Sequence, residues 1–446
     1  AAIAAAERAW PAWRARPAKE RAAVMLKWFH LLQQHADDLA RIMTAEQGKP
    51  LAEAKGEVAY GASFVEWFAE EGRRVYGETI PSTDAGKRFL VIRQPVGVCA
   101  AITPWNFPIA MITRKVAPAL AAGCTVVVKP SEFTSASTLE FVKLVEEAGF
   151  PAGVVNVVTG FGKDVGPALT AHPKVAKISF TGSDATGRAI YEAAAKSFKR
   201  VTLELGGKSP NVVFADAKIE DAVNGAVSGI FAAAGQTCIA GSRLLLQESI
   251  HDQFVDKLTT LARSAKLGNP MSFETQIGPI ATRPQYEKVL GYIDIAKKEG
   301  AQLVMGGGKP SGGEVGDGWF VQPTVFSGVK NSMRIAQEEV FGPVLSIIKF
   351  KDEDEATAIA NDVRFGLGAG VWTSDIGRAF RMSERIQSGT VWVNTYRAVS
   401  YMSPFGGFKD SGLGRENGIE AIREYLQTKS VWISMAGEVA NPFVMR

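Results

Sequence analysis

A cysteine thiol in a short polar loop is the first feature of this sequence that could do chemistry, because Cys238 ends the segment 235–238. The apolar run 226–234 precedes the loop and predicts a helix that stops just before it. Since the thiolate is the nucleophile and needs access to its target, a thiol on a tight loop is well placed to react. Most free cysteines are small buried side chains, so the nucleophile interpretation depends on what surrounds Cys238.

Glu204 and Asn106 could act together with such a thiol. Glu204 stands just before a glycine pair in the segment 201–208, where apolar surroundings raise a carboxyl pKa and favour a general base. Asn106 stands between two aromatic residues and two prolines in the segment 103–108, which would hold its amide rigidly as a donor to an oxyanion. The ordinary alternatives are a solvated strand end for the glutamate and a turn-stabilising amide for the asparagine.

Three connections from strand to helix carry residues that suit a dinucleotide. A lysine and a glutamate in the segment 129–132 could exchange hydrogen bonds with ribose hydroxyls. The pair 182–183 starts a helix whose free N–H groups suit a phosphate, although Ser183 could equally cap the helix. A glycine turn at 160–162, together with Gly166, is the third connection. None matches the Gly-x-Gly-x-x-Gly pattern, so the indication comes from their order along one sheet.

Strands and helices that alternate along the chain would position these residues. Residues 1–75 show helical spacing of apolar side chains, and residues 76–94 suggest a projecting polar hairpin. Continuous apolar strands separated by helices then predict a parallel sheet covered on both faces, which binds ligands beyond the carboxyl ends of its strands. The predicted strands are 96–102, 125–128, 154–158, 177–180 and 201–205, and the predicted helices are 109–122, 137–148, 166–171 and 187–199.

A second α/β series follows between residues 211 and 415. Its predicted strands are 211–214, 243–247, 320–326, 344–350, 368–372 and 389–393, with a glycine-rich exposed loop at 306–318. The tail 429–433 has the pattern of a strand without a neighbour in sequence. Because a lone strand needs a partner, we expect this tail to pair with another subunit.

The composition indicates a globular protein of two or three domains, since 446 residues exceed one compact core. Net charge is only +4 and the bases are interspersed with acids, so we expect no nucleic acid partner. Three cysteines do not form a disulfide framework, which favours reduced thiols and a cytoplasmic location. We expect no membrane span, signal peptide or metal site. Because the chain starts at Ala1 inside a helical pattern, we also expect further residues before it.

Together these motifs resemble those of the NAD(P)-dependent aldehyde dehydrogenase superfamily, in the family's order and over nearly the whole chain. The motifs are 104–108, 129–132, 180–183, 203–208, 235–238, 339–343 and 404–409 with 411–412. The resemblance implies an α/β fold with three parts, which are a Rossmann-type parallel-sheet cofactor domain, an α/β catalytic domain and a small oligomerisation β-extension. It places them at 1–75 with 95–206, at 207–415, and at 76–94 with 428–446, and it implies a homodimer or homotetramer.

The resemblance also implies a role for each chemical group. Cys238 would attack the aldehyde carbon, the Asn106 side chain and the Cys238 N–H would hold the oxyanion, and hydride would pass to nicotinamide. Glu204 would then activate the water that hydrolyses the thioester, and Lys115 would assist proton relay. Family members that transfer the acyl group to coenzyme A lack this glutamate, so Glu204 favours hydrolysis to a free acid.

The same resemblance assigns the cofactor contacts. Lys129 and Glu132 would hold the adenosine ribose, Ser183 the pyrophosphate and Glu339 the nicotinamide ribose. Because Glu132 would repel a 2′-phosphate, we expect NAD, with NADP as the alternative. The expected cofactor contacts are Ile102, Thr103, Pro104, Trp105, Lys129, Ser131, Glu132, Gly162, Gly166, Phe180, Thr181, Gly182, Ser183, Leu205, Gly206, Glu339 and Phe341.

The segment 112–115 resembles the succinate-semialdehyde dehydrogenase branch, in which the arginine binds the distal carboxylate, so Arg114 is a candidate anchor for an acidic group. That branch has a second arginine six residues before the cysteine, where this chain has Ala232. Arg397 or Ser400 could compensate, or the small residues near Ala232 could admit a bulkier or neutral aldehyde. We therefore expect a semialdehyde such as succinate semialdehyde. The alternative is a broad range of aliphatic or aromatic aldehydes.

Two other classes of protein would share some of these features. A cysteine hydrolase would need a histidine beside the thiol, and none of the four histidines stands in a motif. A non-catalytic binding protein on the same fold would be expected to lose at least one of the three chemical groups described above. Cys99 and Cys124 lie within apolar strands, which predicts that they belong to the core.

Overall fold

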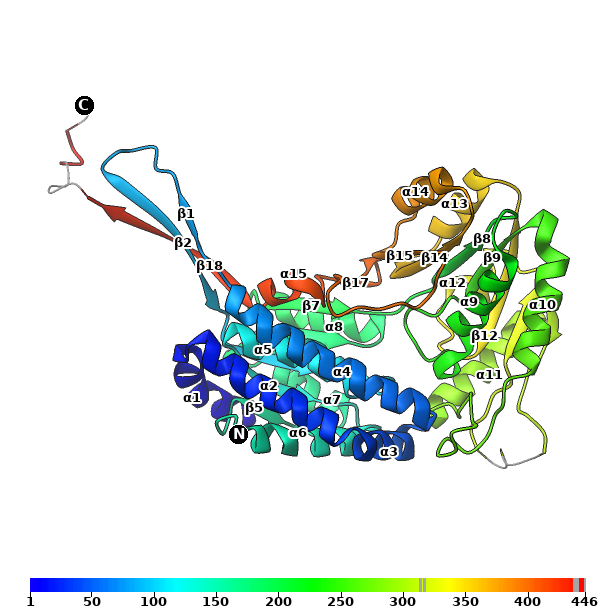
Figure 1. Cartoon of the computed structure of the whole chain (residues 1–446), viewed down its shortest axis with the longest axis horizontal. Coiled ribbons are helices and arrows are strands. Elements are labelled where there is room, and N and C mark those ends of the chain that lie inside the picture. The colour runs from blue at the N-terminus through cyan, green and yellow to red at the C-terminus, as the bar shows by residue number, and fades with distance from the viewer. Residues whose placement is uncertain (313–314, 316–317, 436–440, 445–446) are drawn as a thin grey trace.

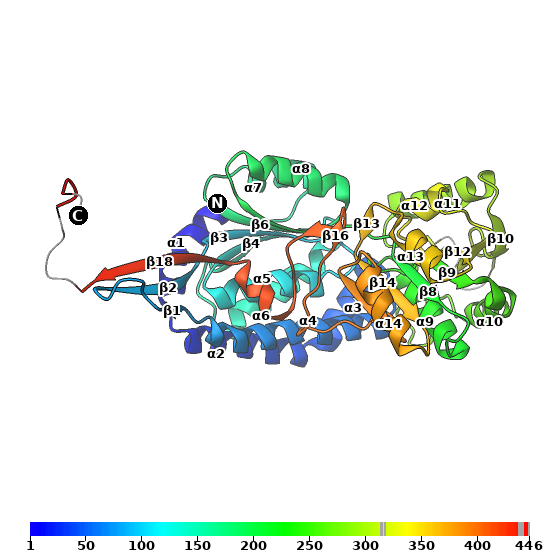
Figure 2. The same ribbon diagram turned by 90° about the horizontal axis from the view of Figure 1, so that it is seen from above.

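Two β-sheets flanked by helices form the body of the molecule, and a third, small sheet projects from it as an arm (Figures 1 and 2). The structure is a computed structural model and describes residues 1–312, 315, 318–435 and 441–444. Residues 205–209 connect the last long strand of the first sheet to the first strand of the second. The α/β architecture predicted from the sequence is confirmed.

Five parallel strands make up most of the first sheet: β3 (Val98–Ile102), β4 (Thr125–Lys129), β5 (Val155–Val157), β6 (Val175–Thr181) and β7 (Arg200–Glu204). A short strand, β17 (Gly412–Leu413), pairs antiparallel with β7, which gives the order β17-β7-β6-β3-β4-β5. Every residue of β3 and β4 is buried, as expected for apolar strands covered on both faces. All five predicted strands are present within a few residues of their predicted bounds.

Helices cover both faces of the first sheet (Figure 2). On one face lie α2 (Ala18–Gln34), α3 (Ala36–Gln47), α4 (Leu51–Glu71), α5 (Ala110–Ala122) and α6 (Ser135–Ala148), and on the other α7 (Gly162–Thr170) and α8 (Asp184–Ala195). The first helix, α1 (Ala2–Ala15), contacts β3, β4 and β5. The helical prediction for residues 1–75 is confirmed. The helix predicted at 166–171 begins earlier, so Gly162 lies in its first turn and not in a preceding glycine turn.

Seven strands form the second sheet, in the order β10 (Gln302–Met305), β11 (Thr324–Ser327), β12 (Val344–Phe350), β9 (Arg243–Gln247), β8 (Pro210–Val213), β14 (Gly368–Trp372) and β15 (Thr390–Val393). All are parallel except the edge strand β10. The strand predicted at 320–326 is shorter in the structure, where it is β11. Strand β10 is not predicted from the sequence, because its four residues next to a glycine-rich segment are too few to show a strand pattern. A two-residue pair, β13 (Phe365–Gly366) with β16 (Phe408–Lys409), lies apart from both large sheets.

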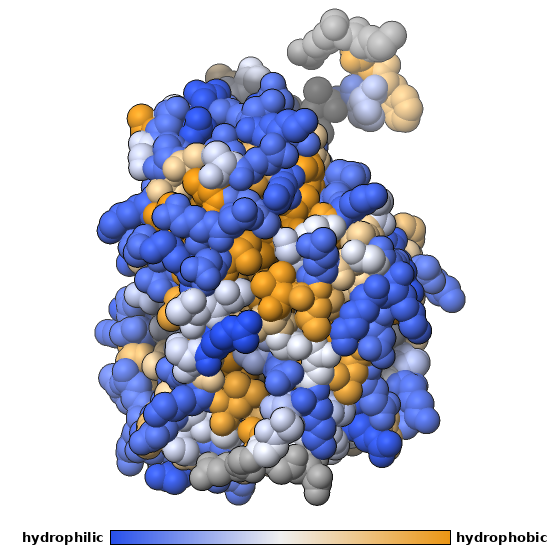
Figure 3. Space-filling view, turned by 90° about the vertical axis from the view of Figure 1, so that its right-hand side faces the viewer, coloured by the Kyte–Doolittle hydropathy of each residue, from blue (hydrophilic) through white to orange (hydrophobic). Residues whose placement is uncertain are grey.

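The helices of the second unit are α9 (Ile219–Phe231), α10 (His251–Arg263), α11 (Arg283–Lys298), α12 (Arg334–Gln337), α13 (Glu353–Asn361) and α14 (Ile376–Arg385). A last helix, α15 (Gly418–Arg423), returns to the first unit and packs on α4 and α5. Seen from the end that carries the second sheet, the surface is mostly hydrophilic, with apolar side chains gathered between the charged ones (Figure 3).

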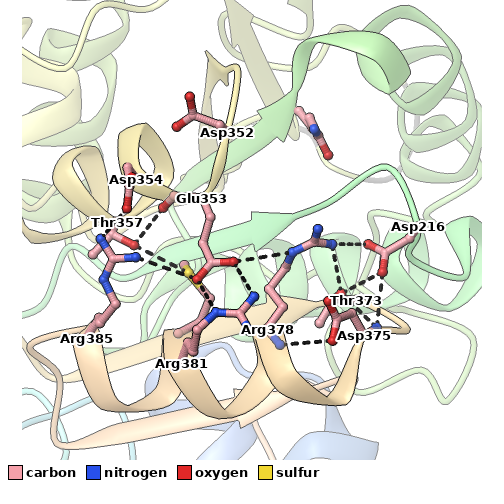
Figure 4. Close-up of polar contacts among 12 residues, drawn as sticks. Asp216, Asp352, Glu353, Asp354, Thr357, Thr373, Asp375, Arg378, Arg381 and Arg385 are labelled. Atoms are coloured by element: carbon pink, nitrogen blue, oxygen red, sulfur yellow. Dashed lines mark hydrogen bonds and ion pairs between the residues drawn. The ribbon is translucent and has the colours of Figure 1, made fainter.

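A cluster of ion pairs holds α13 and α14 together beside the second sheet (Figure 4). Glu353 of α13 pairs with Arg381 at 2.8 Å and lies 3.7 Å from Arg378, both on α14. Asp216 pairs with Arg378 at 2.7 Å and accepts a hydrogen bond from the Thr373 hydroxyl at 2.8 Å. The segment that follows β14 is therefore fixed in place.

The arm consists of β1 (Glu78–Ile80), β2 (Lys87–Pro95) and β18 (Leu426–Ser434), all antiparallel (Figure 1). The predicted hairpin at 76–94 is confirmed. The tail strand is longer than predicted, and it pairs with β2 of its own chain over nine residues. The strand therefore has a pairing partner within its own chain, while β18 remains at the edge of this sheet and its contact with another subunit stays a prediction. A strand that is alone in the sequence can find its partner more than 300 residues away, and a local pattern cannot show this.

Two sequence predictions lie partly outside the described residues. The predicted loop at 306–318 includes 313–314 and 316–317, and the predicted extension at 428–446 includes 436–440 and 445–446. Within the described part of the chain, no helix has both the length and the apolar character needed to cross a membrane.

Candidate active site

The carboxyl ends of the first sheet face the loop before β9 across a cavity of about 270 Å³. The order of the first sheet reverses between β3 and β6, and such a switch point is where parallel sheets bind ligands. Many predicted site residues line this cavity: Pro104, Trp105, Asn106, Arg114, Thr181, Gly182, Ser183, Leu205, Gly206, Cys238, Glu339, Phe341 and Arg397.

Other predicted residues lie outside the lining. The Ser400 hydroxyl accepts a hydrogen bond from the Met402 N–H at 3.1 Å, so the structure places this side chain in a turn. The small residues 232–234 do not line the cavity either. Gly162 and Gly166 lie in α7. The residues at the carboxyl ends of β3, β4 and β6, on the same edge of the sheet as the cavity, are Ile102, Thr103, Lys129, Ser131, Glu132 and Phe180.

The nucleophile loop, residues 232–238, has an unusual backbone. Ala233 and Ala234 have φ of 53° and 51°. This left-handed region costs an L-residue roughly 1–2 kcal/mol. The Ala233 N–H donates to Oε1 of Glu53 at 2.9 Å. Gly235 follows with φ of 70°, and a Cβ there would lie 2.1 Å from a carbonyl oxygen of another loop, so only glycine fits. Surrounding contacts therefore impose the conformation of the loop.

The Asn106 amide lies beside this loop. Its Nδ2 donates to the Gln236 carbonyl at 3.0 Å, and its Oδ1 accepts from the Phe107 N–H at 3.1 Å. The Gln236 side chain in turn accepts from the Ala281 N–H at 2.9 Å. Because an amide nitrogen has two hydrogens, one remains for an oxyanion. The predicted donor is thus held close to Cys238.

Lys49 and Glu57 hold the Asn106 loop from behind. Lys49 Nζ donates to the Asn106 carbonyl at 2.8 Å and forms a buried ion pair with Glu57. Glu57 Oε1 accepts from the N–H groups of Ile109 and Ala110, at the start of α5, where a carboxylate is favourable. The sequence does not single out this pair, because Lys49 lies in the connection between α3 and α4 while Glu57 lies within α4, and such a spacing has no distinguishing pattern.

Cys238 presents its thiol to the cavity. Burial, followed by the charge of Glu339, raises the pKa of Cys238 to about 12. The thiol is therefore protonated near neutral pH and must lose its proton to a base before it can attack. Packing around the residue is tight, since a Cβ at Gly207 would lie 2.2 Å from the Cys238 carbonyl oxygen.

Glu204 ends β7 just behind the wall of the cavity. Among the residues that the structure describes, neither of its carboxylate oxygens has a hydrogen-bond partner. Burial, followed by the charge of Glu416, raises the pKa of Glu204 well above its usual range. A carboxyl group with a raised pKa suits the general-base role that the sequence predicts.

Arg114 and Lys115 converge on the carboxylate of Glu416. Arg114 Nε lies 3.1 Å from Glu416 Oε2, while Lys115 Nζ pairs with Oε1 and donates to the Thr181 hydroxyl at 2.6 Å. Burial acts to raise the pKa of Glu416, but the two cations lower it. With both cations protonated, the cluster carries one net positive charge. Glu416 is a site residue that sequence reasoning missed, because a lone glutamate in a loop has no distinguishing pattern.

Arg114 presents an unused donor. Its guanidinium lies over the Phe405 ring, 4.5 Å from the ring centroid. Its Nη2 is buried and makes no hydrogen bond within the described part of the chain. A buried donor without a partner costs about 1–3 kcal/mol. Because Arg114 lines the cavity, an acidic group bound there would satisfy this donor.

One side of the cavity fits a dinucleotide. The Ser183 hydroxyl accepts from the Thr186 N–H at 3.3 Å and caps α8, whose other first-turn N–H groups remain available for a phosphate. The cap interpretation of Ser183 is confirmed, and its contact with a pyrophosphate stays a prediction. The rings of Trp105 and Phe341 meet edge to face with their centroids 5.5 Å apart. Glu339 Oε1 accepts from the Gly207 N–H at 2.9 Å. Lys129 Nζ lies 3.3 Å from the Glu132 carboxylate and forms a donor and acceptor pair.

A cysteine hydrolase, the alternative considered from the sequence, would need a histidine beside the thiol. None of the four histidines, all of them described, lines the cavity. The ring of His251, for example, bonds to Asp252 and Ser327. Cys99 and Cys124 are buried, as predicted. No group of three or more His, Cys, Asp and Glu side chains among the described residues could hold a metal ion.

Comparison with known proteins agrees with this architecture. The model of the aldehyde dehydrogenase family matches residues 1–431. The succinate-semialdehyde dehydrogenase (NADP(+)) GabD of Escherichia coli K12 is 49% identical over 98% of this chain and 89% of its own length. The glutarate-semialdehyde dehydrogenase of Pseudomonas putida KT2440 is 48% identical over 97% and 89%. The crystal structure of PnpE in complex with nicotinamide adenine dinucleotide superposes with a TM-score of 0.97, at 46% identity, and covers 99% of this chain and 91% of that one.

Fold and site thus define an α/β protein with a cysteine and an amide at the switch point of a parallel sheet. The chain belongs to the aldehyde dehydrogenase family. The resemblance stated from the sequence motifs is confirmed.

Proposed function

We propose that this protein oxidises aldehydes that carry an acidic group, such as succinate semialdehyde, to carboxylic acids with NAD(P). The observation that carries the proposal is one cavity lined by the Cys238 thiol, the Asn106 amide and Arg114. Membership of the aldehyde dehydrogenase family supports the reaction. Two similar proteins are named for succinate and glutarate semialdehyde, which supports an acidic substrate.

In this proposal the Cys238 thiol gives its proton to water, and the sulfur then bonds to the aldehyde carbon. The remaining Asn106 Nδ2 hydrogen and the Cys238 backbone N–H donate to the oxyanion that forms. When the cofactor is bound, its nicotinamide ring supplies a hydride acceptor. The acyl group is then held on Cys238 as a thioester.

Glu204 takes a proton from the water that hydrolyses the thioester. Its carboxylate comes beside Cys238 by rotation of the side chain, and rotation breaks no hydrogen bond to a described residue. Lys115, Glu416 and Thr181 form a bonded group near it, which suits transfer of the proton away from the cavity. Hydrolysis gives a free carboxylic acid.

The first unit, residues 1–75 and 95–206, binds the cofactor, and residues 207–415 form the catalytic domain. The start of α8 holds the pyrophosphate, Glu339 the nicotinamide ribose, and Lys129 with Glu132 the adenosine ribose. A carboxylate beside the ribose repels a 2′-phosphate, so NAD is preferred over NADP. The name of the E. coli relative includes NADP(+), and the preference for NAD therefore rests on Glu132.

Arg114 selects the acidic substrate. Its Nη2 is a buried donor without an acceptor, and the cluster that contains it has one positive charge in excess. A hydrogen bond to a charged group contributes about 1.5–3 kcal/mol. A carboxylate on the substrate would gain this energy, whereas an uncharged chain of the same length would not.

Initial rates of NADH formation test this function. The substrates are succinate semialdehyde and butanal, an uncharged aldehyde with the same number of carbons. We expect kcat/KM for the semialdehyde to exceed that for butanal by at least about tenfold, or ~1.4 kcal/mol, and Arg114→Gln to remove the difference. Equal values in the wild type would favour the broader aldehyde specificity. No turnover with either cofactor would refute the function.

The same proposal includes a homodimer or homotetramer in the cytoplasm. The arm exposes apolar side chains in a single chain, including Trp432, which is 65% exposed, Ile80 and Ile433. A second copy that covers the arm would remove this apolar surface from water. All three cysteines are free, which suits a reducing compartment.

A further inference from the structure

A second arginine lines the cavity from the other unit. Arg114 comes from α5, and Arg397 comes from the loop after β15. Arg397 Nη1 donates to the Ser228 carbonyl at 3.0 Å. Ser228 lies in the last turn of α9, where carbonyl groups lack partners within the helix and a cation is favourable. Arg397 is therefore attached to the helix that leads into the nucleophile loop.

Hydrogen bonds fix the chain on both sides of Arg397. The Tyr396 hydroxyl donates to the Ile239 carbonyl at 2.9 Å, and the Trp392 indole donates to the Ala398 carbonyl at 2.7 Å. Arg397 itself has φ of 63°, a left-handed conformation that persists only where the surroundings impose it. The side chain thus starts from a rigid backbone.

The base of this loop is also fixed. The Asn394 side chain accepts from the Thr373 N–H at 3.0 Å and donates to the Thr373 carbonyl at 2.9 Å. Thr373 is held by Asp216 in the ion-pair cluster of Figure 4. The loop therefore presents Arg397 without further ordering, which reduces the entropy lost when a ligand binds.

The rest of the Arg397 guanidinium is unpaired. Its Nε and Nη2 make no hydrogen bond or ion pair with any residue that the structure describes. Glu53 forms no ion pair with Arg397, and its Oε1 accepts from Ala233. Because an arginine side chain stays protonated in proteins, a positive charge without an ion-pair partner among the described residues lines the cavity, and the charge of Glu53 favours it without forming an ion pair.

The cavity therefore has an excess of positive charge. Arg114 and Lys115 share one carboxylate, Glu416, which leaves one charge when Lys115 is protonated, although burial lowers the Lys115 pKa; Arg397 adds another charge. Burial raises the pKa of Glu204 and of Glu339, so these acids compensate less than ordinary surface carboxylates would. Buried charges of this kind are normally paired, and the missing partner is an anion.

We propose that Arg397 determines specificity by binding the acidic group of the substrate together with Arg114. This inference rests on the function proposed above. The aldehyde carbon stays at Cys238, and the carboxylate accepts hydrogen bonds from Arg114 and from the free donors of Arg397. Arginine suits this task because its planar donors match the two oxygens of a carboxylate.

Arg397 could instead act only as a cap for α9, and two variants separate the roles. Arg397→Gln keeps a neutral donor for the Ser228 carbonyl but removes the charge, whereas Arg397→Lys keeps the charge. For Arg397→Gln we expect KM for succinate semialdehyde to rise about tenfold or more, with kcat and the butanal kinetics within about twofold of wild type. Arg397→Lys should recover part of the loss in KM. Arg423→Gln, at an exposed ion pair on α15, is the matched control. It should leave the kinetic constants for both substrates unchanged.

The outcomes are distinguishable. If Arg397 only caps α9, Arg397→Gln should change KM for the semialdehyde and for butanal equally, or lower kcat. Either result would overturn the inference. If the wild type prefers the semialdehyde and Arg114→Gln loses that preference while Arg397→Gln keeps the wild-type KM, only the inference about Arg397 fails. If the wild type shows no preference, the proposed substrate class fails first. The double variant should lose less than the sum of the single variants, because both side chains bind one group.

Discussion

At the scale of single residues, burial controls the chemistry of the site. The Cys238 thiol has a pKa of about 12 and the Glu204 carboxyl has a raised pKa, in both cases mainly because they are out of water. The neutral forms of both groups are therefore favoured in the resting protein. The proposed role of Asn106, by contrast, depends on its position, since hydrogen bonds to Gln236 and Phe107 fix its amide.

Glu204 should make stability and hydrolysis respond to pH in opposite directions. Its folded-state pKa is raised, so its contribution to stability is complete below the usual glutamate pKa of about 4.3 and is lost as pH rises through the raised value. Loss of the same proton creates the base, so thioester hydrolysis should accelerate over that range. Melting temperatures between pH 5 and 9 check this for wild type and Glu204→Gln. In wild type the free energy of unfolding should fall with pH by up to about 1.4 kcal/mol per pH unit more than in the variant. An equal pH dependence in the two proteins would contradict the assignment.

Glu132 should decide between the two cofactors. Replacing it with serine removes a negative charge beside the Lys129 ammonium and leaves that cation free for a phosphate. We expect Glu132→Ser to raise kcat/KM for NADP about tenfold, or ~1.4 kcal/mol, and to change kcat/KM for NAD less. Initial rates with both cofactors give the ratio of kcat/KM for NADP to kcat/KM for NAD. Glu140→Ser, at an exposed position on α6, also removes one negative charge and should not alter this cofactor ratio.

At the scale of elements, the site depends on contacts between segments distant in sequence. The nucleophile loop takes two left-handed alanines because Glu53 of α4 accepts from the Ala233 N–H, while the Gln236 side chain donates to the Ala233 carbonyl within the loop. The Asn106 loop is held by Lys49 and Glu57, which precede it by about 50 residues.

Glu53 should therefore affect the reactivity of Cys238 without touching the substrate. Glu53→Ala leaves the Ala233 N–H without its acceptor, a loss of about 1–3 kcal/mol, and lets the strained loop relax. We expect the rate of Cys238 alkylation by iodoacetamide, and kcat, to fall about tenfold. Glu53→Gln keeps an acceptor and should remain close to wild type. Unchanged alkylation in Glu53→Ala would show that the loop holds its conformation without this bond.

Sequence reasoning succeeded where the signal is local. Continuous apolar runs gave the parallel strands, such as β9, β12 and β14, at their observed bounds. The motifs also gave most of the cavity lining. Glu416 and the pairing of β18 with β2 escaped because their partners lie more than 300 residues away. The sequence left Arg397 and Ser400 as alternatives, and only the structure shows that Arg397 alone lines the cavity.

At the scale of the whole molecule, the arm exposes apolar side chains that a second copy of the chain would cover in the proposed assembly. The arm is a three-stranded sheet that extends away from the body (Figure 1). Trp432 of this sheet packs on Phe89 and is largely exposed. Only three residues of β1 extend the two-stranded pair of β2 and β18, and two-stranded pairs are marginally stable on their own in water. Contact with a second copy would stabilise the arm and give the proposed dimer or tetramer.

A charge on the apolar side chains of the arm should therefore disrupt the assembly. For Trp432→Asp we expect the mass from light scattering to fall to that of one chain, because a buried unpaired charge costs several kcal/mol. Thr428→Asp, at an exposed polar position of the same strand, is the control and should keep the wild-type mass. A wild-type protein that is already monomeric, or an unchanged mass for Trp432→Asp, would contradict the proposed role of the arm.

In the proposed reaction an acidic aldehyde becomes a thioester on Cys238, which Glu204 then helps to hydrolyse. Intact-protein mass spectrometry of Glu204→Gln, mixed with succinate semialdehyde and NAD, tests this most directly. We predict a mass increase of one succinyl group, located by peptide mapping on Cys238, together with one equivalent of NADH and hydrolysis slowed about 10²–10⁴-fold. Omitting NAD should leave no stable acyl adduct. An unmodified Cys238 in a sample that forms NADH, or an acyl group on another residue, would contradict the account.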